Sequence, residues 1–215
     1  MQVDNFDQFI QELRASIHQL PGIEAQQKMM PLHRLRKIYD NLDLITDAKL
    51  SSVLILLYPH EGQIYIPLTK RHDYKGTHGG QISLPGGKVD ENDKDRIYTA
   101  LREAEEEIGV ASSDVTVIGT LSEIYIPPSN FKVLPVIGYI NQRLDFVREE
   151  YEVEQIIETP LVKLLDESNH KAKDMSVPIG TLKQVPYFDV DGHVVWGATA
   201  IILSEFVHIL RDMQS

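Results

Sequence analysis

Residues 84–110 constrain the fold more than any other stretch, and they read LPGGKVDENDKDRIYTALREAEEEIGV. A Gly-rich turn at 85–87 and an acidic loop at 90–95 come first. Apolar residues then recur at helical spacing, which predicts a buried helical stripe made of Ile97, Ala100, Leu101, Ala104 and Ile108. The stretch therefore predicts a turn and a loop that lead into an amphipathic helix packed on a core.

Three carboxylates accompany this stripe. Glu103, Glu106 and Glu107 occupy positions i, i+3 and i+4, which predicts one exposed strip about one turn long. Like charges at this spacing repel, and carboxylate oxygens suit Mg²⁺ or Mn²⁺, ions that also hold phosphates. A solvated acidic helix face is the alternative explanation. The Gly-rich turn directly before the helix favours a metal site.

The same residues resemble the signature of the Nudix hydrolases. That signature consists of Gly, five variable residues, Glu, seven variable residues, Arg-Glu, an aliphatic residue, any residue, Glu-Glu, any residue, Gly and an aliphatic residue. Gly87 opens the pattern, which closes on Arg102, Glu103, Ala104, Glu106, Glu107, Gly109 and Val110. Asp93 replaces the early Glu, and the interval from Gly87 to Arg102 is one residue longer. The extra residue falls in a loop, and the same lengthening is found in the branch that resembles coenzyme A pyrophosphatases.

The resemblance implies a catalytic centre. Glu103, Glu106 and Glu107 would bind Mg²⁺ or Mn²⁺ against a substrate diphosphate. Glu103 and Glu106 belong to the implied catalytic set. Arg102 belongs to it as well, because it would pair with acids of the loop and helix and fix the orientation of the ligands. Gly86 and Gly87 would let the loop close beside the helix where the substrate binds.

A basic, Gly-rich loop at residues 70–83 leads into the signature. Arg71 is suited to hold phosphate by a bidentate fork and Lys75 as a point charge. The alternative is an ordinary polar loop with surface cations, and its position beside the signature favours phosphate contact. His72 and His78 stay outside the catalytic set, because a lone loop histidine is more often a surface or hydrogen-bonding residue.

This loop also resembles the motif that precedes the signature in coenzyme A pyrophosphatases. The matching residues are Leu68, Thr69, Arg71, Gly80, Pro85, Gly86 and Gly87. Three positions depart from the motif, since His72 replaces a Ser, Gly76 replaces a second Arg and Leu84 replaces a Phe. The missing Arg leaves one cation fewer for the substrate, and the adjacent Lys75 is the candidate to replace it.

A further carboxylate is expected after the strands that follow the helix. The segment 148–158 reads REEYEVEQIIE, and it resembles the strand region where many Nudix enzymes carry an additional acid near the metals. Glu152 aligns best with that acid, and it would bind a second metal or accept a proton from the attacking water. Plain surface charge is the alternative, because Glu149, Glu150 and Glu154 lie close by.

Hydrophobic patterning predicts the remaining elements. Residues 53–58 and 63–69 read as a hairpin, 115–121 and 131–140 as strands, and 185–190 with 193–195 as a hairpin around Asp191-Gly192. A closing helix begins in the run WGATA, at 196–200. Within the run from 124 to 140, Tyr125 and Phe131 either stack on a base or pantetheine chain or close the core. The predicted fold is α/β, a Nudix-type α/β/α sandwich with a mixed sheet.

The first 50 residues are predicted to form a helical extension, and residues 51–215 the Nudix hydrolase domain. Apolar residues at helical spacing before the break at Pro21-Gly22 are Phe6, Phe9, Ile10, Leu13 and Ile17. A second helical pattern follows at 32–42. The extension either packs over the core or meets a second copy in a homodimer, and we favour packing.

Composition excludes several classes of protein. The 215 residues contain no Cys, which excludes a disulfide scaffold and a zinc-thiolate site. A net charge of -11 argues against a nucleic-acid partner, which requires a basic surface. The apolar runs are too short to span a bilayer, and the N-terminus lacks a secretory pattern, so we expect no membrane partner and a cytoplasmic location.

The resemblance implies hydrolysis of a phosphoanhydride in a nucleoside diphosphate derivative. The expected substrate is coenzyme A or its derivatives, cleaved to adenosine 3',5'-bisphosphate and 4'-phosphopantetheine. An ADP-ribose or other nucleoside-diphosphate pyrophosphatase is the alternative within the enzyme class. A Nudix domain that senses a nucleotide without hydrolysis is the alternative from another class, and the three retained carboxylates argue against it.

Overall fold

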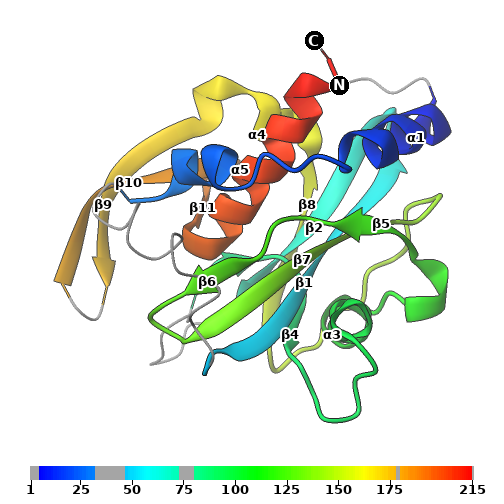
Figure 1. Cartoon of the computed structure of the whole chain (residues 1–215), viewed down its shortest axis with the longest axis horizontal. Coiled ribbons are helices and arrows are strands. Elements are labelled where there is room, and N and C mark those ends of the chain that lie inside the picture. Colours follow the sequence, from blue (N-terminus) through cyan, green and yellow to red (C-terminus); the bar gives the residue numbers. More distant parts are fainter. Residues whose placement is uncertain (1–4, 32–46, 73–79, 178–179, 215) are drawn as a thin grey trace.

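Eleven strands and several short helices make up the described part of the chain, residues 5–31, 47–72, 80–177 and 180–214 of a computed structural model (Figure 1). The α-helices are α1 (Phe6–Ser16), α2 (Ile23–Gln26), α3 (Arg96–Ile108), α4 (Leu161–Leu165) and α5 (Gly197–Asp212). Short 3₁₀ turns are η1 (Gln27–Met29), η3 (Ser112–Asp114) and η4 (Glu167–Asn169). The helical pattern expected at 32–42 lies outside the described residues.

The strands form a large mixed sheet and a smaller one. The large sheet contains β1 (Lys49–His60), β2 (Gln63–Arg71), β3 (Ile82–Ser83), β4 (Gly86–Lys88), β5 (Thr116–Thr120), β6 (Ile124–Ile126), β7 (Phe131–Tyr139) and β8 (Val153–Pro160). Strand β1 pairs antiparallel with β2 and β4 and parallel with β7. The small sheet contains β9 (His170–Val177), β10 (Gly180–Val190) and β11 (His193–Trp196) in the order β11-β10-β9. Both predicted hairpins are therefore confirmed, in β1–β2 and β10–β11.

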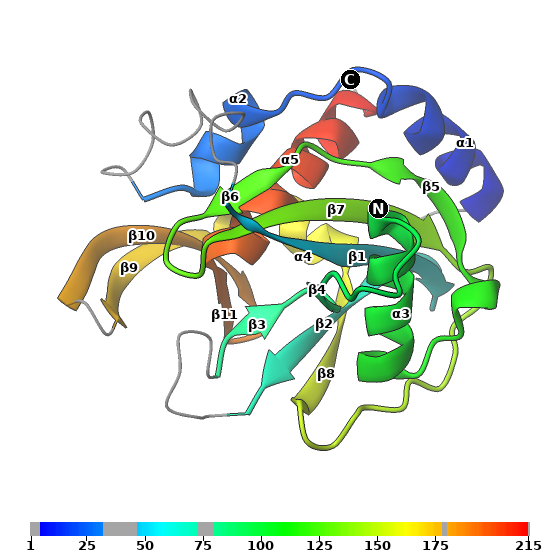
Figure 2. The ribbon, with the colours of Figure 1, turned by 60° about the horizontal axis from the view of Figure 1, so that its bottom comes forward.

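Alternation along β1 creates two separate cores. Leu54 and Leu56 belong to a cluster with the apolar stripe of α3, whereas Ile55 and Leu57 belong to a cluster with α5. Successive side chains of a strand point to opposite faces of its sheet, so α3 and α5 cover opposite faces, as Figure 2 shows. The predicted α/β fold, with a mixed sheet between helices and an N-terminal helix, is confirmed.

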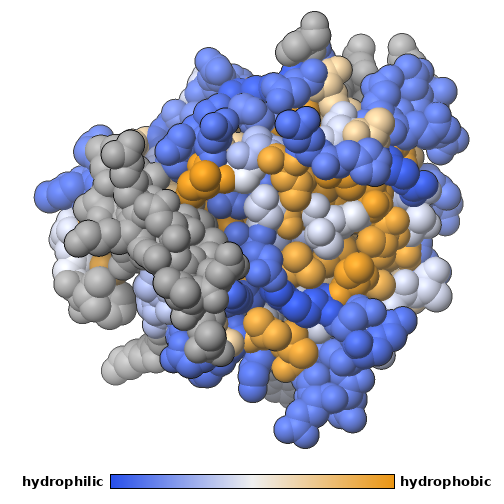
Figure 3. All heavy atoms as spheres, viewed as in Figure 1, coloured by the Kyte–Doolittle hydropathy of each residue, from blue (hydrophilic) through white to orange (hydrophobic). Residues whose placement is uncertain are grey.

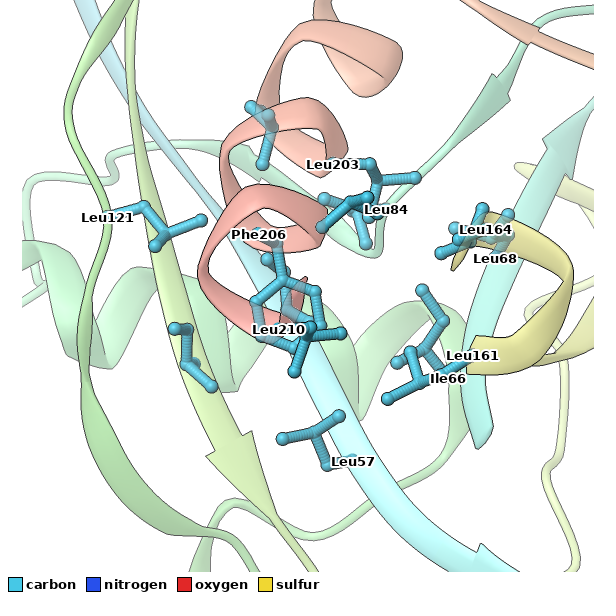
Figure 4. Packing of buried hydrophobic residues seen from close by; sticks show 14 of the residues in the cluster. Leu57, Ile66, Leu68, Leu84, Leu121, Leu161, Leu164, Leu203, Phe206 and Leu210 are labelled. Carbon is cyan, nitrogen blue, oxygen red and sulfur yellow. The ribbon is translucent and has the colours of Figure 1, made fainter. Parts of the chain in front are cut away.

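The larger core lies between α5 and the sheet. Figure 4 shows Phe206 and Leu210 of α5 facing Leu57 of β1, with side chains of β2 and α4 beside them. Phe206 and Leu57 are fully buried. Because α5 is buried around much of its circumference, it is a structural centre of this half of the molecule rather than a surface helix.

Helix α1 packs on this same half. Asn5 caps it, since its side chain accepts a hydrogen bond from the Gln8 backbone N–H at 3.1 Å. Phe9, Ile10 and Leu13 are buried in the α5 core. Helix α1 thus packs on the core, and the extension as a whole stays a prediction because residues 1–4 and 32–46 lie outside the described part of the chain.

A fully buried carboxylate ties the segment after α1 to α5. Glu205 of α5 accepts hydrogen bonds from the Gly22 backbone N–H at 3.1 Å, the Gln26 side-chain amide at 2.8 Å and the Ser122 hydroxyl at 2.7 Å. A buried charge is tolerated only where such donors surround it. Glu205 therefore joins three segments that are distant in the sequence.

Charged and polar residues dominate the outline of the face in Figure 3, and hydrophobic residues gather toward its centre and right. Within the described ranges, no helix is long and apolar enough to cross a membrane.

Candidate active site

Helix α3 begins and ends at residues that fix its position. The Asp95 side chain accepts from the Tyr98 backbone N–H at 2.7 Å and caps the N-terminus. Gly109 ends the helix in the left-handed conformation, with φ of 72°. Ala100, Ala104 and Ile108 are buried against β1. The helix therefore packs against β1 and β4. Its carboxylates Glu103 and Glu107 lie beside the Gly-rich turn.

Glu103 fits against the turn only because residue 87 has no side chain. A Cβ atom on Gly87 would collide with the Glu103 carboxylate. The Arg102 guanidinium lies 2.9 Å from Glu103 Oε1. Burial raises the pKa of Glu103, and the charges of Glu106 and Glu152 add to this effect.

Glu107 is buried, whereas its spacing from Glu103 predicted an exposed position. Only 3% of its side chain is exposed, because position 107 follows Ala104 by three residues and Ala100 by seven and so lies on the buried stripe. The Gly86 backbone N–H donates to Oε2 at 3.1 Å, and Arg71 Nη2 donates to Oε1 at 3.1 Å. Burial raises the pKa of Glu107 to about 7 despite these donors. The prediction of one exposed strip of three carboxylates is wrong for this residue.

Arg102 joins the acidic loop to the helix. It donates to both carboxylate oxygens of Asp93, at 2.8 and 2.9 Å, and to Glu106 Oε2 at 3.0 Å. Asp93 also accepts from the Thr99 hydroxyl at 2.8 Å, and hydrogen bonds from Arg102 hold its pKa well below the usual range. Asp93, which stands where the family pattern has a Glu, therefore forms an ion pair with Arg102. The ion pairs that the family resemblance implied for Arg102 are present.

The turn that carries Glu152 lies alongside the end of α3. The Glu149 backbone N–H donates to the Glu107 carbonyl at 3.0 Å. The Glu149 carboxylate accepts from the backbone N–H groups of Tyr151 at 2.8 Å and Glu152 at 2.7 Å. Burial is the main cause of the raised pKa of Glu103 and of Glu107, and the charge of Glu152 adds to it in both cases. Sequence reasoning treated Glu149 as surface charge and missed its position in this turn.

The basic loop is described only in part. Arg71 ends β2 and pairs with Glu107. His72 lies 2.9 Å from the Glu150 carbonyl through Nε2, outside the carboxylate set. Lys75, Gly76 and His78 lie outside the described residues. Of the two predicted phosphate-binding cations, the structure therefore places Arg71 beside the carboxylates.

The donor chemistry of the site fits a divalent metal ion. Among the residues that the structure describes, no three acidic or histidine side chains converge as a ready-made metal centre. Arg102 instead lies between Glu103 and Glu106, and Arg71 holds Glu107. Even so, burial raises the pKa of both Glu103 and Glu107, and the charge of Glu103 adds to the effect at Glu107. Hard oxygen donors of this kind suit Mg²⁺ or Mn²⁺.

Tyr125 and Phe131 make contacts with other parts of the molecule. The Tyr125 hydroxyl donates to the Asn130 side chain at 2.9 Å, and Phe131 packs partly buried against the α5 core. Lys49 lies 5.8 Å above the Phe131 ring centre. Phe131 thus packs on the core, which was one of the two roles expected for it from the sequence.

Comparison with known proteins identifies the class. A family model described as the NUDIX domain matches residues 48–173. The chain is 38% identical over 162 residues to Nudix hydrolase 15, mitochondrial, of Arabidopsis thaliana, an alignment that covers 72% of this chain and 56% of that protein. It is 36% identical over 137 residues to the uncharacterized Nudix hydrolase NudL of Yersinia enterocolitica, covering 63% of this chain and 69% of that protein. The chain belongs to the Nudix family.

Solved structures agree on the fold. A Nudix hydrolase from M. smegmatis, RenU, aligns with a TM-score of 0.51 and 16% identity over 78% of this chain and 86% of its own. The MutT protein from Methanosarcina mazei aligns with a TM-score of 0.51 and 17% identity over 78% of this chain and 96% of its own. The chain spans little more than half the length of the two Arabidopsis relatives, 56% and 53%.

Proposed function

We propose that the protein is a metal-dependent hydrolase of the diphosphate bond in coenzyme A or its derivatives. The observation that supports this reaction class is the position of two carboxylates against the Gly-rich turn. The Gly86 N–H donates to Glu107, and the lack of a side chain at Gly87 leaves room for Glu103. Desolvated carboxylates suit a metal ion, and Arg71 at the end of β2 adds a positive charge that suits a polyanionic substrate.

Three carboxylates would hold the metal, namely Glu103, Glu106 and Glu107. Bound Mg²⁺ or Mn²⁺ supplies charge neutralisation on the diphosphate and a lowered pKa for a bound water. The chain itself supplies orientation. Arg102 bridges Glu106 and Asp93, so the acidic loop and the helix stay in one arrangement.

Arg71 and Glu152 complete the proposed set. Arg71 lies at the end of β2 with a guanidinium that already contacts a carboxylate of the site, a place from which it reaches a substrate phosphate. Glu152 belongs to the turn that is hydrogen-bonded to the end of α3, and it would accept the proton of the attacking water. Lys75 remains the second proposed phosphate contact, on sequence alone.

Coenzyme A as the substrate rests on the sequence motifs. Support comes from the matches at Thr69, Arg71 and Gly80 and from the lengthened loop that contains Asp93. The Gly at position 76, where the motif has a second Arg, favours ADP-ribose or another nucleoside diphosphate derivative as the alternative substrate. Retention of all three metal-ligating carboxylates argues against a domain that only senses nucleotide.

Product analysis separates these substrates. Purified protein with Mg²⁺ or Mn²⁺ would be incubated in parallel with coenzyme A, ADP-ribose and a diadenosine polyphosphate, and the products resolved by chromatography. We expect adenosine 3',5'-bisphosphate from coenzyme A. Turnover of ADP-ribose with coenzyme A intact would overturn the substrate and leave the reaction class standing.

A pair of variants tests the reaction class in the same assay. Glu106→Gln removes a proposed ligand and should lower kcat at least about 100-fold while the fold persists. Glu105→Gln is the matched control on the same helix, because Glu105 is exposed and its carboxylate accepts hydrogen bonds from Ser112, away from the proposed ligands. Equal activity of the two variants would contradict the assigned role of Glu106.

A further inference from the structure

A hollow lies between β8 and the segment that connects β7 with β8, residues 140–152. It has a volume of about 320 Å³ and is open to solvent. Its lining residues are Arg143, Phe146, Arg148, Ile156 and Glu158. Pockets that bind small organic molecules begin at about 300 Å³. The hollow can therefore hold a ligand larger than a single ion.

Two of the lining side chains are apolar. Phe146 and Ile156 are partly buried against the cluster that contains the apolar stripe of α3. The Phe146 ring packs edge-on against the buried Tyr58 ring, with 5.3 Å between the ring centres. Phe146 and Ile156 keep part of their surface toward the hollow. This surface can therefore contact an apolar group of a ligand.

An ion pair between Arg143 and Glu158 also lines the hollow. The Nε and Nη2 atoms of Arg143 donate to the two Glu158 carboxylate oxygens at 2.8 and 2.7 Å. Glu158 accepts a further hydrogen bond from the Tyr58 hydroxyl at 2.9 Å. The third nitrogen of Arg143 contacts Asp145, whose side chain is fully exposed, and such pairs are weak. The charges of Arg143 and Glu158 thus offset each other within the hollow.

Arg148 adds a positive charge that has no such partner. Its Nη1 atom donates to the Val153 carbonyl at 2.8 Å, and no carboxylate in the described part of the chain forms an ion pair with its guanidinium. The neighbouring Glu149 carboxylate instead accepts from the backbone N–H groups of Tyr151 and Glu152. The rest of the Arg148 guanidinium is therefore available to a ligand in the hollow.

The backbone on both sides of Arg148 is held against the end of α3. The Val147 N–H donates to the Ile108 carbonyl at 3.1 Å, and the Glu149 N–H donates to the Glu107 carbonyl at 3.0 Å. Because these hydrogen bonds exist without a ligand, a ligand would meet an arginine whose backbone is already in place. Binding to a group that is positioned in advance costs less conformational entropy.

We propose that this hollow binds a small monocarboxylate with an apolar body, and that the carboxylate pairs with Arg148. One uncompensated positive charge matches a monoanion, and the planar guanidinium suits the two oxygens of a carboxylate. Phe146 and Ile156 contact the apolar body of the ligand. The site is distinct from the proposed hydrolase site, because none of the residues that line the hollow is a proposed metal ligand or phosphate contact.

Calorimetric titration of the full chain in EDTA tests the proposal, with benzoate, acetate and benzyl alcohol as probes. We expect saturable binding of benzoate, with an affinity at least about fivefold higher than that of acetate because only benzoate contacts the apolar wall. Benzyl alcohol, which lacks the charge, should not bind. Arg148→Gln should weaken benzoate binding at least about fivefold. Arg14→Gln, at an exposed position of α1, is the matched control and should leave the affinity unchanged.

A second variant separates lost charge from altered structure. Arg148→Lys keeps the positive charge and should retain benzoate binding, so equal losses in Arg148→Lys and Arg148→Gln would overturn the proposal by giving Arg148 a structural role. Absence of saturable benzoate binding to wild type would also overturn it. A third contrary result is an affinity that Arg148→Gln leaves unchanged and Arg71→Gln abolishes, which would place the carboxylate at the hydrolase site instead.

Discussion

Glu107 is a proposed metal ligand whose burial lowers the stability of the fold when it is ionised. Its carboxylate is buried on the apolar stripe of α3, with a cation on one oxygen and a backbone N–H on the other. Burying an ionised carboxylate costs free energy that these partners do not fully offset, which is why its pKa rises to about 7.

This shift predicts a pH dependence of stability in metal-free protein. The folded pKa of about 7 exceeds the ordinary value of 4.5, so the stability linked to the neutral acid is complete below about pH 4.5 and is lost as pH rises through 7. Urea unfolding in EDTA at pH 5 and pH 8 should show that wild type loses about 2 to 3 kcal/mol relative to Glu107→Gln over that interval. Parallel pH profiles for the two proteins would contradict the burial cost assigned to Glu107.

Adjacent glycines of the turn should respond differently to Ala. In Gly87→Ala the new Cβ meets the end of the flexible Glu103 side chain, which moves aside. We expect metal affinity and kcat to fall at least about tenfold, while the urea midpoint changes little. In Gly86→Ala the Cβ meets the Ser52 backbone, and the φ of 153° disfavours any side chain.

The second variant should therefore lose stability by at least about 1 to 3 kcal/mol, since the clash cannot be relieved by rotating a side chain. Chemical denaturation and metal titration of the two variants, run side by side, distinguish a residue that makes room for a ligand from one that shapes the backbone. Equal losses of stability in both would contradict this assignment.

At the scale of elements, the sequence predicted the strand pairings that depend on residues close together in the chain. The hairpins at β1–β2 and β10–β11 follow from turn residues and alternating strands that adjoin in sequence. The parallel pairing of β1 with β7 joins Lys49 to Phe131, and no local signal specifies such a distant partner. Strand β9 was not predicted either, because most of its residues are exposed and it is held by pairing with β10.

The same distinction applies to the candidate site. Glu103 and Glu106 were identified from helical spacing, and Arg102 from the family pattern. The burial of Glu107 was overlooked, although its spacing from Ala100 and Ala104 contains the signal. The turn formed by Glu149 depends on tertiary contact with the end of α3, so sequence alone does not reveal it.

Helix α5 depends on a polar contact as well as on packing. Glu205→Gln keeps one acceptor oxygen and replaces the other with an NH₂ group. The Gln26 side-chain amide, which donates to Glu205 Oε2 in the wild type, would then face a second donor. We expect a loss of about 2 to 4 kcal/mol in the free energy of unfolding, measured by urea denaturation. Glu24→Gln, at an exposed position of α2, is the control and should change stability by less than about 0.5 kcal/mol. Similar losses in both variants would contradict the role of Glu205.

At the scale of the whole molecule, metal binding should be visible in thermal stability. A ligand that binds only the folded state at 100 times its Kd stabilises by about 2.7 kcal/mol. For a chain of 215 residues, this corresponds to a rise in Tm of about 5 to 10 °C on moving from EDTA to saturating Mg²⁺ or Mn²⁺. Calorimetry of wild type, Glu106→Gln and Glu105→Gln provides the measurement.

Only the Glu106 variant should lose the increase in Tm. An increase of the same size in all three proteins would place the ion elsewhere on this acidic chain and would remove the support for a metal centre on α3.

The alternating side chains of β1 also bear on how this molecule tolerates sequence change. Leu54 and Leu56 support the helix that carries the carboxylates, whereas Ile55 and Leu57 support α5. Substitutions at Ile55 or Leu57 change packing on the face of the sheet opposite to the α3 carboxylates, because the strand backbone separates the two cores. A protein engineer can therefore raise thermal tolerance on one face of the sheet and alter catalytic preference on the other, and combine the two sets of substitutions with nearly additive effects.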